Sequence, residues 1–293
     1  MKISVVGALT VDLIGDEPVV GGPPWYAGIA AHRCGARVSL ISTVGEDFPE
    51  YFFREIVEAG LDTSGVKTVK GARTYSFKPV FTESGRRLRL VSQGPRISLE
   101  QLEELDADAV IISPVFKELE LEHLDAVRRR VERLTVDLQG FVRESGECGE
   151  IYLKPLNNTN LLKYAEVVHC SEEEAQAISM KNTPYEALRF MHRHGVGKCL
   201  LGVENGLYVM NGDSVMFIQV IDPQRVADTT GAGDILTGAF TALACQGLSA
   251  EESAVRALEL VRLSMNYHPP LRVPERLTSS QPLCRVVWRK SVG

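Results

Sequence analysis

Residues 228–234 read DTTGAGD, a run in which three small residues stand between two threonines and an aspartate. A strand-like segment, VMFIQVID at 215–222, precedes this run, and a helix-like pattern follows it. We therefore expect the amides of Gly231, Ala232 and Gly233 to point outward together at a helix N-terminus, where unpaired N–H groups bind anions. Because glycine also lets a ligand approach the backbone closely, the run predicts a phosphate-binding turn.

The carboxylate of Asp234 falls in the first turn of that predicted helix, beside the expected phosphate. The helix dipole should hold the pKa of this carboxyl group low. An ionised carboxylate in this place can accept the proton of a hydroxyl nucleophile. The run thus predicts phosphoryl transfer to an alcohol, and the simpler interpretation is a glycine turn followed by a helix-stabilising aspartate.

Strand and helix patterns alternate along most of the chain, which predicts a mostly parallel sheet with helices on both faces. Apolar runs typical of buried strands lie at 3–7, 38–43, 109–113, 134–138, 166–170 and 199–203. Helical patterns lie at about 23–33, 49–59, 118–132, 172–180, 184–194 and 232–246. A final helix is expected to begin with the capping box of Ser249 and Glu252 and to run to about residue 266, where HPP at 268–270 stops it.

Two segments interrupt this alternation. TYSFKPVFTESGRRLRLVSQ at 74–93 has strand-like stretches around the turn signal ESGR, and LIGDEPVV occupies 13–20. We expect residues 13–20 and 74–93 to form a small β lid over a substrate cleft, attached to an α/β core of residues 1–12, 21–73 and 94–293. The alternative is a hairpin packed on the domain surface.

Composition excludes several classes of protein. The chain has 293 residues, 44% of them hydrophobic, and a formal net charge of −6, which argues against a nucleic-acid partner. No apolar run approaches a membrane span, and the N-terminus does not resemble a signal peptide. The six scattered cysteines form no metal or redox motif, so we expect a cytoplasmic protein with reduced thiols.

Three segments resemble the PfkB (ribokinase-like) family of carbohydrate and nucleoside kinases. DTTGAGD, with ILTGAF after it, resembles the second signature of the family. VGALTVDLI at 6–14 is similar to its first strand, and GGPPWYAGIAAHRCGARVSLISTVGEDF at 21–48 resembles its first signature. The resemblance implies a ribokinase-like three-layer sandwich with a small β lid. It also implies an ATP- and Mg²⁺-dependent kinase and a homodimer through the lid.

The resemblance also implies roles for single residues. Asp234 would be the catalytic base, and the amides of Gly231, Ala232 and Gly233 would form the anion hole for the transferred phosphoryl group. The positions that would hold hydroxyl groups of the acceptor are Asp12, Gly21 and Gly22.

Further matches concern the donor and the metal. Asp228 and Thr230 match positions near the phosphates and the monovalent-cation loop. Glu174, in CSEEEA, takes the place of the glutamate of the family's NxxE motif, which organises magnesium and its waters. LGVENG, with Gly202 and Gly206, matches the turn that contacts the nucleotide phosphates.

The sequence also departs from the family pattern. Tyr26 stands where sugar kinases of the family commonly have an asparagine, and Ser171 replaces the asparagine of NxxE. VRLSMNYHPP at 261–270 lacks the glycine-rich loop that often completes the adenine and potassium sites, so a requirement for a monovalent cation stays open.

The acceptor is suggested by VDLQGFVR at 136–143, which resembles inositol kinases within the family. A cyclic polyol such as myo-inositol ranks first, with Trp25 and Tyr26 covering its ring and Asp12 and Gln139 binding its hydroxyl groups. The alternative for Trp25 and Tyr26 is that they pack their helix against the sheet. Arg143 would reach the substrate or the phosphate. A nucleoside such as cytidine ranks second, and a sugar acid or sugar phosphate third.

An alternative from another class is a non-catalytic sugar or nucleoside sensor on the same fold. The retained Asp234 speaks against it, because a sensor needs no base. A dinucleotide fold is excluded, since no GxGxxG follows the first strand.

Overall fold

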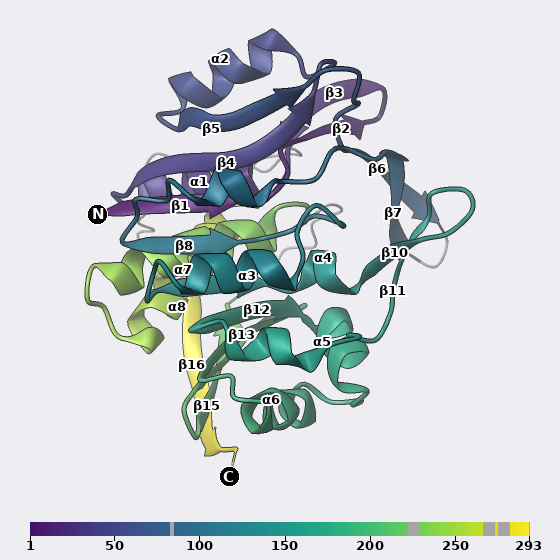
Figure 1. Ribbon diagram of the computed structural model, residues 1–293. Coiled ribbons are helices and arrows are strands. Elements are labelled where there is room, and N and C mark those ends of the chain that lie inside the picture. The colour runs from purple at the N-terminus through teal and green to yellow at the C-terminus, as the bar shows by residue number, and fades with distance from the viewer. Residues whose placement is uncertain (83–84, 222–228, 266–272, 275–281, 293) are drawn as a thin grey trace.

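The computed structural model describes residues 1–82, 85–221, 229–265, 273–274 and 282–292. Its main feature is a ten-stranded sheet in the order β16-β15-β14-β13-β12-β9-β8-β1-β4-β5 (Figure 1). Seven neighbouring strands run parallel: β1 (Lys2–Val6), β4 (Arg37–Gly45), β5 (Asp62–Val69), β8 (Ala109–Ile112), β9 (Leu134–Asp137), β12 (Val167–Ser171) and β13 (Lys198–Val203). The remaining three are antiparallel: β14 (Gly206–Asn211), β15 (Ser214–Val220) and β16 (Cys284–Ser291).

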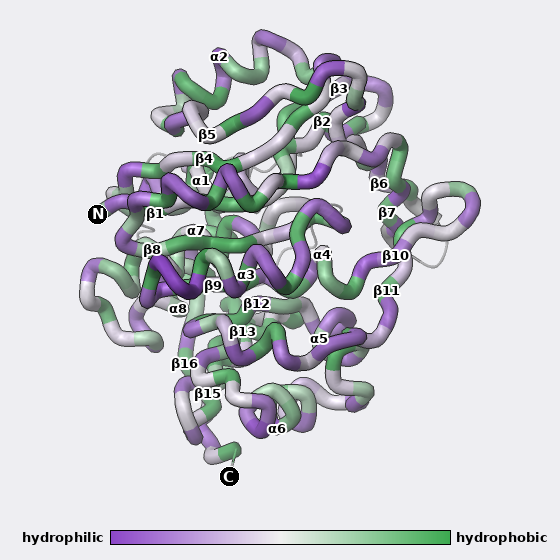
Figure 2. The backbone as a smooth tube through the Cα atoms, in the orientation of Figure 1, coloured by the Kyte–Doolittle hydropathy of each residue, from purple (hydrophilic) through white to green (hydrophobic). Residues whose placement is uncertain are grey.

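Helices cover both faces of this sheet and bury a separate apolar layer on each. The helices on one face are α1 (Pro23–Arg33), α2 (Glu50–Glu58), α7 (Ala232–Cys245) and α8 (Ala250–Ser264). The other face carries α3 (Leu121–Arg128), α5 (Glu172–Ser179) and α6 (Pro184–Arg193). The central strands are apolar on both sides, as Figure 2 shows for β8. This two-sided burial is what continuous β-branched runs predict.

Three hairpins lie outside the large sheet. They are β2 (Thr10–Ile14) with β3 (Glu17–Gly21), β6 (Ser76–Thr82) with β7 (Gly85–Ser92), and β10 (Arg143–Ser145) with β11 (Ile151–Leu153). The amide of Val11 donates to the carbonyl of Tyr75 at 2.9 Å, which joins the first hairpin to the second. A bridge between Arg89 and Glu150 joins the second to the third. The hairpins therefore form one continuous group beside the core (Figure 1).

Most predicted elements agree with the structure to within two residues, and one helix does not. The helix predicted at 118–132 is shorter in the structure, where α3 covers Leu121–Arg128. Glu118 belongs to the loop before α3, where its buried carboxyl group accepts hydrogen bonds from the amides of Val115 and Phe116. The strands β5, β14 and β16 and the β10–β11 hairpin were not predicted. The segment 268–270, expected to end the last helix, lies outside the described residues. Within the described part of the chain, none of the helices has the length and apolar character that crossing a bilayer requires.

Candidate active site

A cavity of about 980 Å³ opens where the carboxyl ends of the central parallel strands meet the hairpins. Strands β9, β12 and β13 supply side chains from their carboxyl ends, and the N-terminus of α7 closes another side. Phe77 of β6 and Leu88 of β7 contribute an apolar wall. In open α/β sheets this edge is the usual place for a ligand.

The cavity brings together most of the residues that the sequence singled out. Those lining it are Asp12, Gly22, Tyr26, Gln139, Arg143, Ser171, Glu174, Gly202, Gly206, Thr230, Gly231, Ala232, Gly233 and Asp234. Gly21 does not line it, but a side chain at Gly21 would collide with the Asp12 carboxylate, so this glycine leaves room for the aspartate. Asp228 lies outside the described residues.

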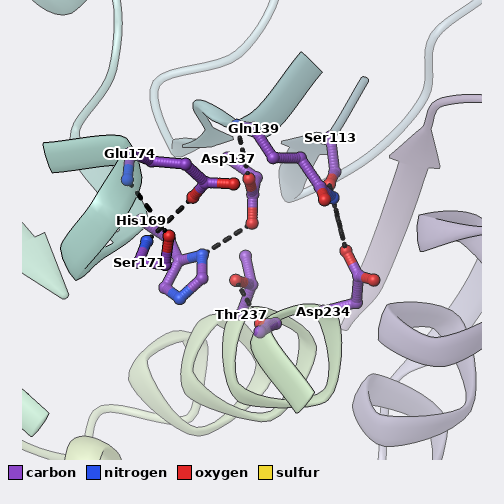
Figure 3. A network of polar contacts seen from close by, with 9 residues as sticks. Ser113, Asp137, Gln139, His169, Ser171, Glu174, Asp234 and Thr237 are labelled. Carbon is purple, nitrogen blue, oxygen red and sulfur yellow. Dashed lines mark hydrogen bonds and ion pairs between the residues drawn. The ribbon is translucent and has the colours of Figure 1, made fainter. Parts of the chain in front are cut away.

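Asp234 is buried in the first turn of α7. Its Oδ1 accepts hydrogen bonds from Ser113 Oγ and from Gln139 Nε2, both at 3.2 Å (Figure 3). Burial, and after it the charge of Asp137, raise the pKa of Asp234, while the charges of His169 and Arg143 lower it, and the net result is a pKa of about 7. The expectation of a low pKa is therefore wrong, because loss of hydration outweighs the helix dipole.

The turn before Asp234 depends on glycine. Gly231 caps α7 with φ of 86°, in the left-handed region that favours glycine. A Cβ atom at Gly231 would lie 2.6 Å from Cγ of Tyr26, so the buried tyrosine ring packs directly against the turn. A Cβ atom at Gly233 would lie 2.7 Å from Cε1 of His169. Two rings thus enclose the turn at close range.

A buried ion pair lies beside the turn. Nδ1 of His169 is 2.6 Å from Oδ2 of Asp137, and both side chains are almost inaccessible to solvent. Burial lowers the pKa of His169, but the charge and hydrogen bond of Asp137 raise it to about 9 overall. The backbone amide of Gln139 donates to Oδ1 of Asp137 at 2.9 Å, which fixes that carboxylate (Figure 3).

Neither member of this pair was singled out from the sequence. Asp137 ends β9, His169 lies near the end of β12, and the two residues are register partners in these parallel strands. A signal was present, since the carboxyl ends of parallel strands meet at the ligand-binding edge. Ser113, which follows β8 directly, was missed in the same way.

Glu174 is buried and shares a capping box with Ser171 at the start of α5. The Ser171 amide donates to Glu174 Oε2 at 2.8 Å, and burial raises the pKa of this carboxyl group. Among the described residues no group of three or more His, Cys, Asp or Glu side chains could hold a metal alone. In proteins Mg²⁺ keeps water and phosphate oxygens as ligands and needs one or two carboxylates, so the single carboxylate of Glu174 fits this ion.

The part of the cavity near Asp12 suits a hydroxylated molecule with an apolar face. Asp12 supplies a carboxylate, and the apolar wall consists of Tyr26, Phe77, Leu88 and Val115. Trp25 does not belong to this wall. Its side chain is buried in the core that α1 shares with the sheet, so the expectation that it covers the acceptor is wrong. The guanidinium of Arg143 donates to the Val115 carbonyl at 3.0 Å and lines the same space.

Residues 3–268 match the family described as pfkB family carbohydrate kinase. A cytidine kinase of Thermococcus kodakarensis is 29% identical over 274 residues, which cover 89% of this chain and 95% of the relative. A 2-dehydro-3-deoxygluconokinase of Thermoproteus tenax is 30% identical over 271 residues, 83% of this chain and 77% of the relative.

Solved structures share the fold at lower identity. A pyrophosphate-dependent kinase of the ribokinase family, complexed with a pyrophosphate analog and myo-inositol, superposes with a TM-score of 0.82 at 22% identity, covering 93% of this chain and 98% of that one. A putative ribokinase II of E. coli in complex with ATP and Mg²⁺ gives a TM-score of 0.71 at 18% identity, covering 94% and 96%. The architecture is therefore ribokinase-like.

Proposed function

The chain belongs to the pfkB family of carbohydrate kinases, and on that premise we propose that it transfers the γ-phosphoryl group of ATP to a hydroxyl group of myo-inositol or a related cyclic polyol. The observation that carries the proposal is the carboxylate of Asp234. It is buried at the N-terminus of α7, held by Ser113 and Gln139, and placed beside a glycine turn.

In the proposed reaction Asp234 accepts the proton of the acceptor hydroxyl group. The hydroxyl oxygen attacks the γ-phosphorus, and the bond from that phosphorus to the bridging oxygen of the donor breaks. The amides of Gly231 and Gly233 would bind the oxygens of the transferred group, where negative charge is concentrated. The expectation that the Ala232 amide joins them is wrong, because this amide donates to the Thr229 carbonyl at 3.0 Å. A pKa of about 7 suits a base that works near neutral pH.

The donor side takes its residues from β12, α5 and the β13–β14 connection. Magnesium, when bound, neutralises charge on the donor phosphates, and Glu174 would organise the ion and its waters. Ser171, Gly202 and Gly206 from these elements line the cavity, as does Thr230 before α7, and all four would contact the donor.

The acceptor proposal is supported by the chemistry of the cavity wall. A cyclic polyol has an apolar ring with hydroxyl groups around its edge. Phe77 and Leu88 offer it apolar contact, while the carboxylate of Asp12 can accept two hydrogen bonds from neighbouring hydroxyl groups. Gly22 would let the backbone lie close to the acceptor. Its φ of 89° favours glycine, and a Cβ atom there would lie 2.2 Å from the Ala8 carbonyl oxygen, so no side chain fits.

A nucleoside is the second candidate, because the cytidine kinase of T. kodakarensis resembles nearly the whole chain. The same apolar wall can stack on a base, and Asp12 can bind the 2′- and 3′-hydroxyl groups of a ribose. A sugar acid is the third candidate, for which Arg143 would bind the carboxylate. Homodimerisation through the lid and a cytoplasmic location stay predictions.

The test is a matrix of donors and acceptors with the pure protein and Mg²⁺. The donors are ATP and pyrophosphate, and the acceptors are inositols, nucleosides, sugar acids and sugar phosphates. Donor consumption and phosphorylated product are measured together, so that hydrolysis is not counted as transfer. We expect ATP and myo-inositol to give the highest kcat/KM. Efficient turnover of cytidine without turnover of inositol would replace the acceptor, and absence of product with every pair would contradict the proposed function.

A further inference from the structure

The Asp137–His169 pair is the one buried ion pair among the described residues that touches the phosphate-binding turn. Together with Asp137 of β9, three ionisable groups from other elements surround His169: Glu174 of α5, Asp234 of α7 and Arg143 at the start of β10. Glu174 and Asp234 interact electrostatically with both members of the pair, and Arg143 interacts with these two carboxyl groups. Three of the four groups around His169 are carboxyl groups. A site with so many carboxyl groups needs a fixed positive charge if the base is to ionise.

We propose that His169, held by Asp137, is a positioning residue for the transfer step, which braces Gly233 and supplies the positive charge that keeps Asp234 able to accept a proton. The inference rests on the proposed function, because it concerns the base of that reaction. Its geometric basis is the 2.6 Å contact of Nδ1 with Asp137 and the packing of the ring edge against Gly233, the residue next to the base.

The arrangement fixes both the place and the charge of the ring. The Asp137 side chain cannot rotate away, because its second oxygen accepts a hydrogen bond from the backbone amide of Gln139 at 2.9 Å. The ring cannot move toward α7, because the Gly233 backbone already fills that space. Gln139 also links Asp137 to the proposed base, since its side-chain amide donates to Oδ1 of Asp234 at 3.2 Å. His169 therefore acts on Asp234 through charge and through the position of the turn.

The first measurement reads the ionisation of Asp234 without any activity. Protein with ¹³C-labelled aspartate carboxyl groups is titrated by NMR, and the resonance of Asp234 is identified by its absence in Asp234→Asn. His169→Gln keeps a hydrogen-bond donor for Asp137 but removes the charge. We expect the midpoint of Asp234 to rise by about one pH unit in this variant. An unchanged midpoint would overturn the proposal, whatever the protein phosphorylates.

The second measurement separates charge from packing. In the double variant Asp137→Asn/His169→Gln, both charges are absent, so the midpoint of Asp234 should return toward the wild-type value. The apparent pKa of the acid limb of kcat/KM for the acceptor should follow the same order. The wild type and the double variant should have similar values, and the value for His169→Gln should be about one pH unit higher. If the double variant keeps the shift of the single one, the ring acts through packing alone and the proposal is wrong.

His123→Gln is the matched control. His123 is also buried, and it bonds to the Ile97 carbonyl and the Glu120 amide, but it does not line the cavity. We expect this variant to leave both the Asp234 midpoint and the acid limb unchanged. A wild-type protein without transferase activity would remove the proposed function, and the NMR titration would still decide whether His169 controls the ionisation of Asp234.

Discussion

At the scale of residues, Asp234, the proposed base, lowers the stability of the folded protein at neutral and alkaline pH. The pKa of Asp234 is raised to about 7, so the native state holds its proton where the unfolded chain has lost it. The free energy of unfolding therefore falls as pH rises from about 4 to 7, and this loss persists at higher pH. Active sites often keep such unfavourable groups because the reaction needs them.

We expect Asp234→Asn to lower turnover by about 10²- to 10⁴-fold, the usual contribution of a positioned base. The same change should raise the melting temperature at pH 8 but not at pH 4, because it removes a buried charge that exists only at the higher pH. Steady-state kinetics and thermal melts at the two pH values check both outcomes. A variant that keeps a third of wild-type turnover would remove the role of base.

A second prediction concerns Asp12. Asp12→Ala should lower kcat/KM for the acceptor by about 30- to 1,000-fold, equivalent to roughly 2–4 kcal/mol for lost charged hydrogen bonds. The KM of the donor should change little. The control is Asp16→Ala in the same hairpin, because Asp16 is exposed and pairs only at the surface with Lys78. Equal losses in the two variants would mean that the hairpin, not the carboxylate, binds the acceptor.

At the scale of elements, one buried carboxylate joins the loops that carry the site. Glu118 is fully buried and accepts hydrogen bonds from the amides of Ala8, Val115 and Phe116. These amides belong to the segments after β1 and β8, which lead to Asp12 and follow Ser113. Glu118 therefore fixes the loop that leads to Asp12 relative to the loop that follows Ser113.

We expect Glu118→Ala to destabilise the protein by about 3 kcal/mol or more, because three buried amides lose their acceptor. Acceptor KM should rise even where the variant is still folded. Glu120→Ala is the control, since Glu120 forms an exposed ion pair with Arg96. Urea denaturation and acceptor kinetics measure both effects. A loss as small as that of the control would show that the loops hold their positions without Glu118.

The sequence could predict elements whose signals are local. The capping box of Ser249 and Glu252 is present, with the Ser249 hydroxyl at 2.8 Å from Glu252. Helix α7 begins directly after Gly231, as the run DTTGAGD predicted. The contact of Asp137 with His169 depends instead on the order of strands in the sheet. The pKa of Asp234 depends on burial. Such properties arise only when distant segments pack, so no pattern around either residue contained them.

At the scale of the whole molecule, the hairpins cover one side of the cavity. Phe77 and Leu88 reach the cavity from β6 and β7, while Val80 and Val91 of the same strands are exposed. The boundaries of the lid proposed from the sequence, 13–20 and 74–93, enclose most of the first two hairpins. The third, β10–β11, should move with them because Leu90 bonds to Gly149 at 2.7 Å.

We expect amide hydrogen exchange in residues 74–93 to slow when the acceptor binds, because closure excludes water from the transfer step. Residues 143–153 should slow in parallel. Exchange in β8, at the centre of the sheet, serves as the internal control and should not change. Equal exchange with and without a saturating acceptor would indicate a static wall rather than a lid.

The position of β1 inside the sheet, between β8 and β4, has a consequence for biosynthesis. A ribosome releases this strand early, yet its second neighbour follows only after about a hundred more residues, at Ala109–Ile112. Until then the nascent chain presents an unpaired central edge, which is prone to association with other chains. Asp234, the proposed base, emerges later still. A chain interrupted before residue 234 lacks the proposed base and also lacks most of α7 and all of α8, which cover one face of the sheet, so truncated products of this gene should be inactive and should expose apolar surface.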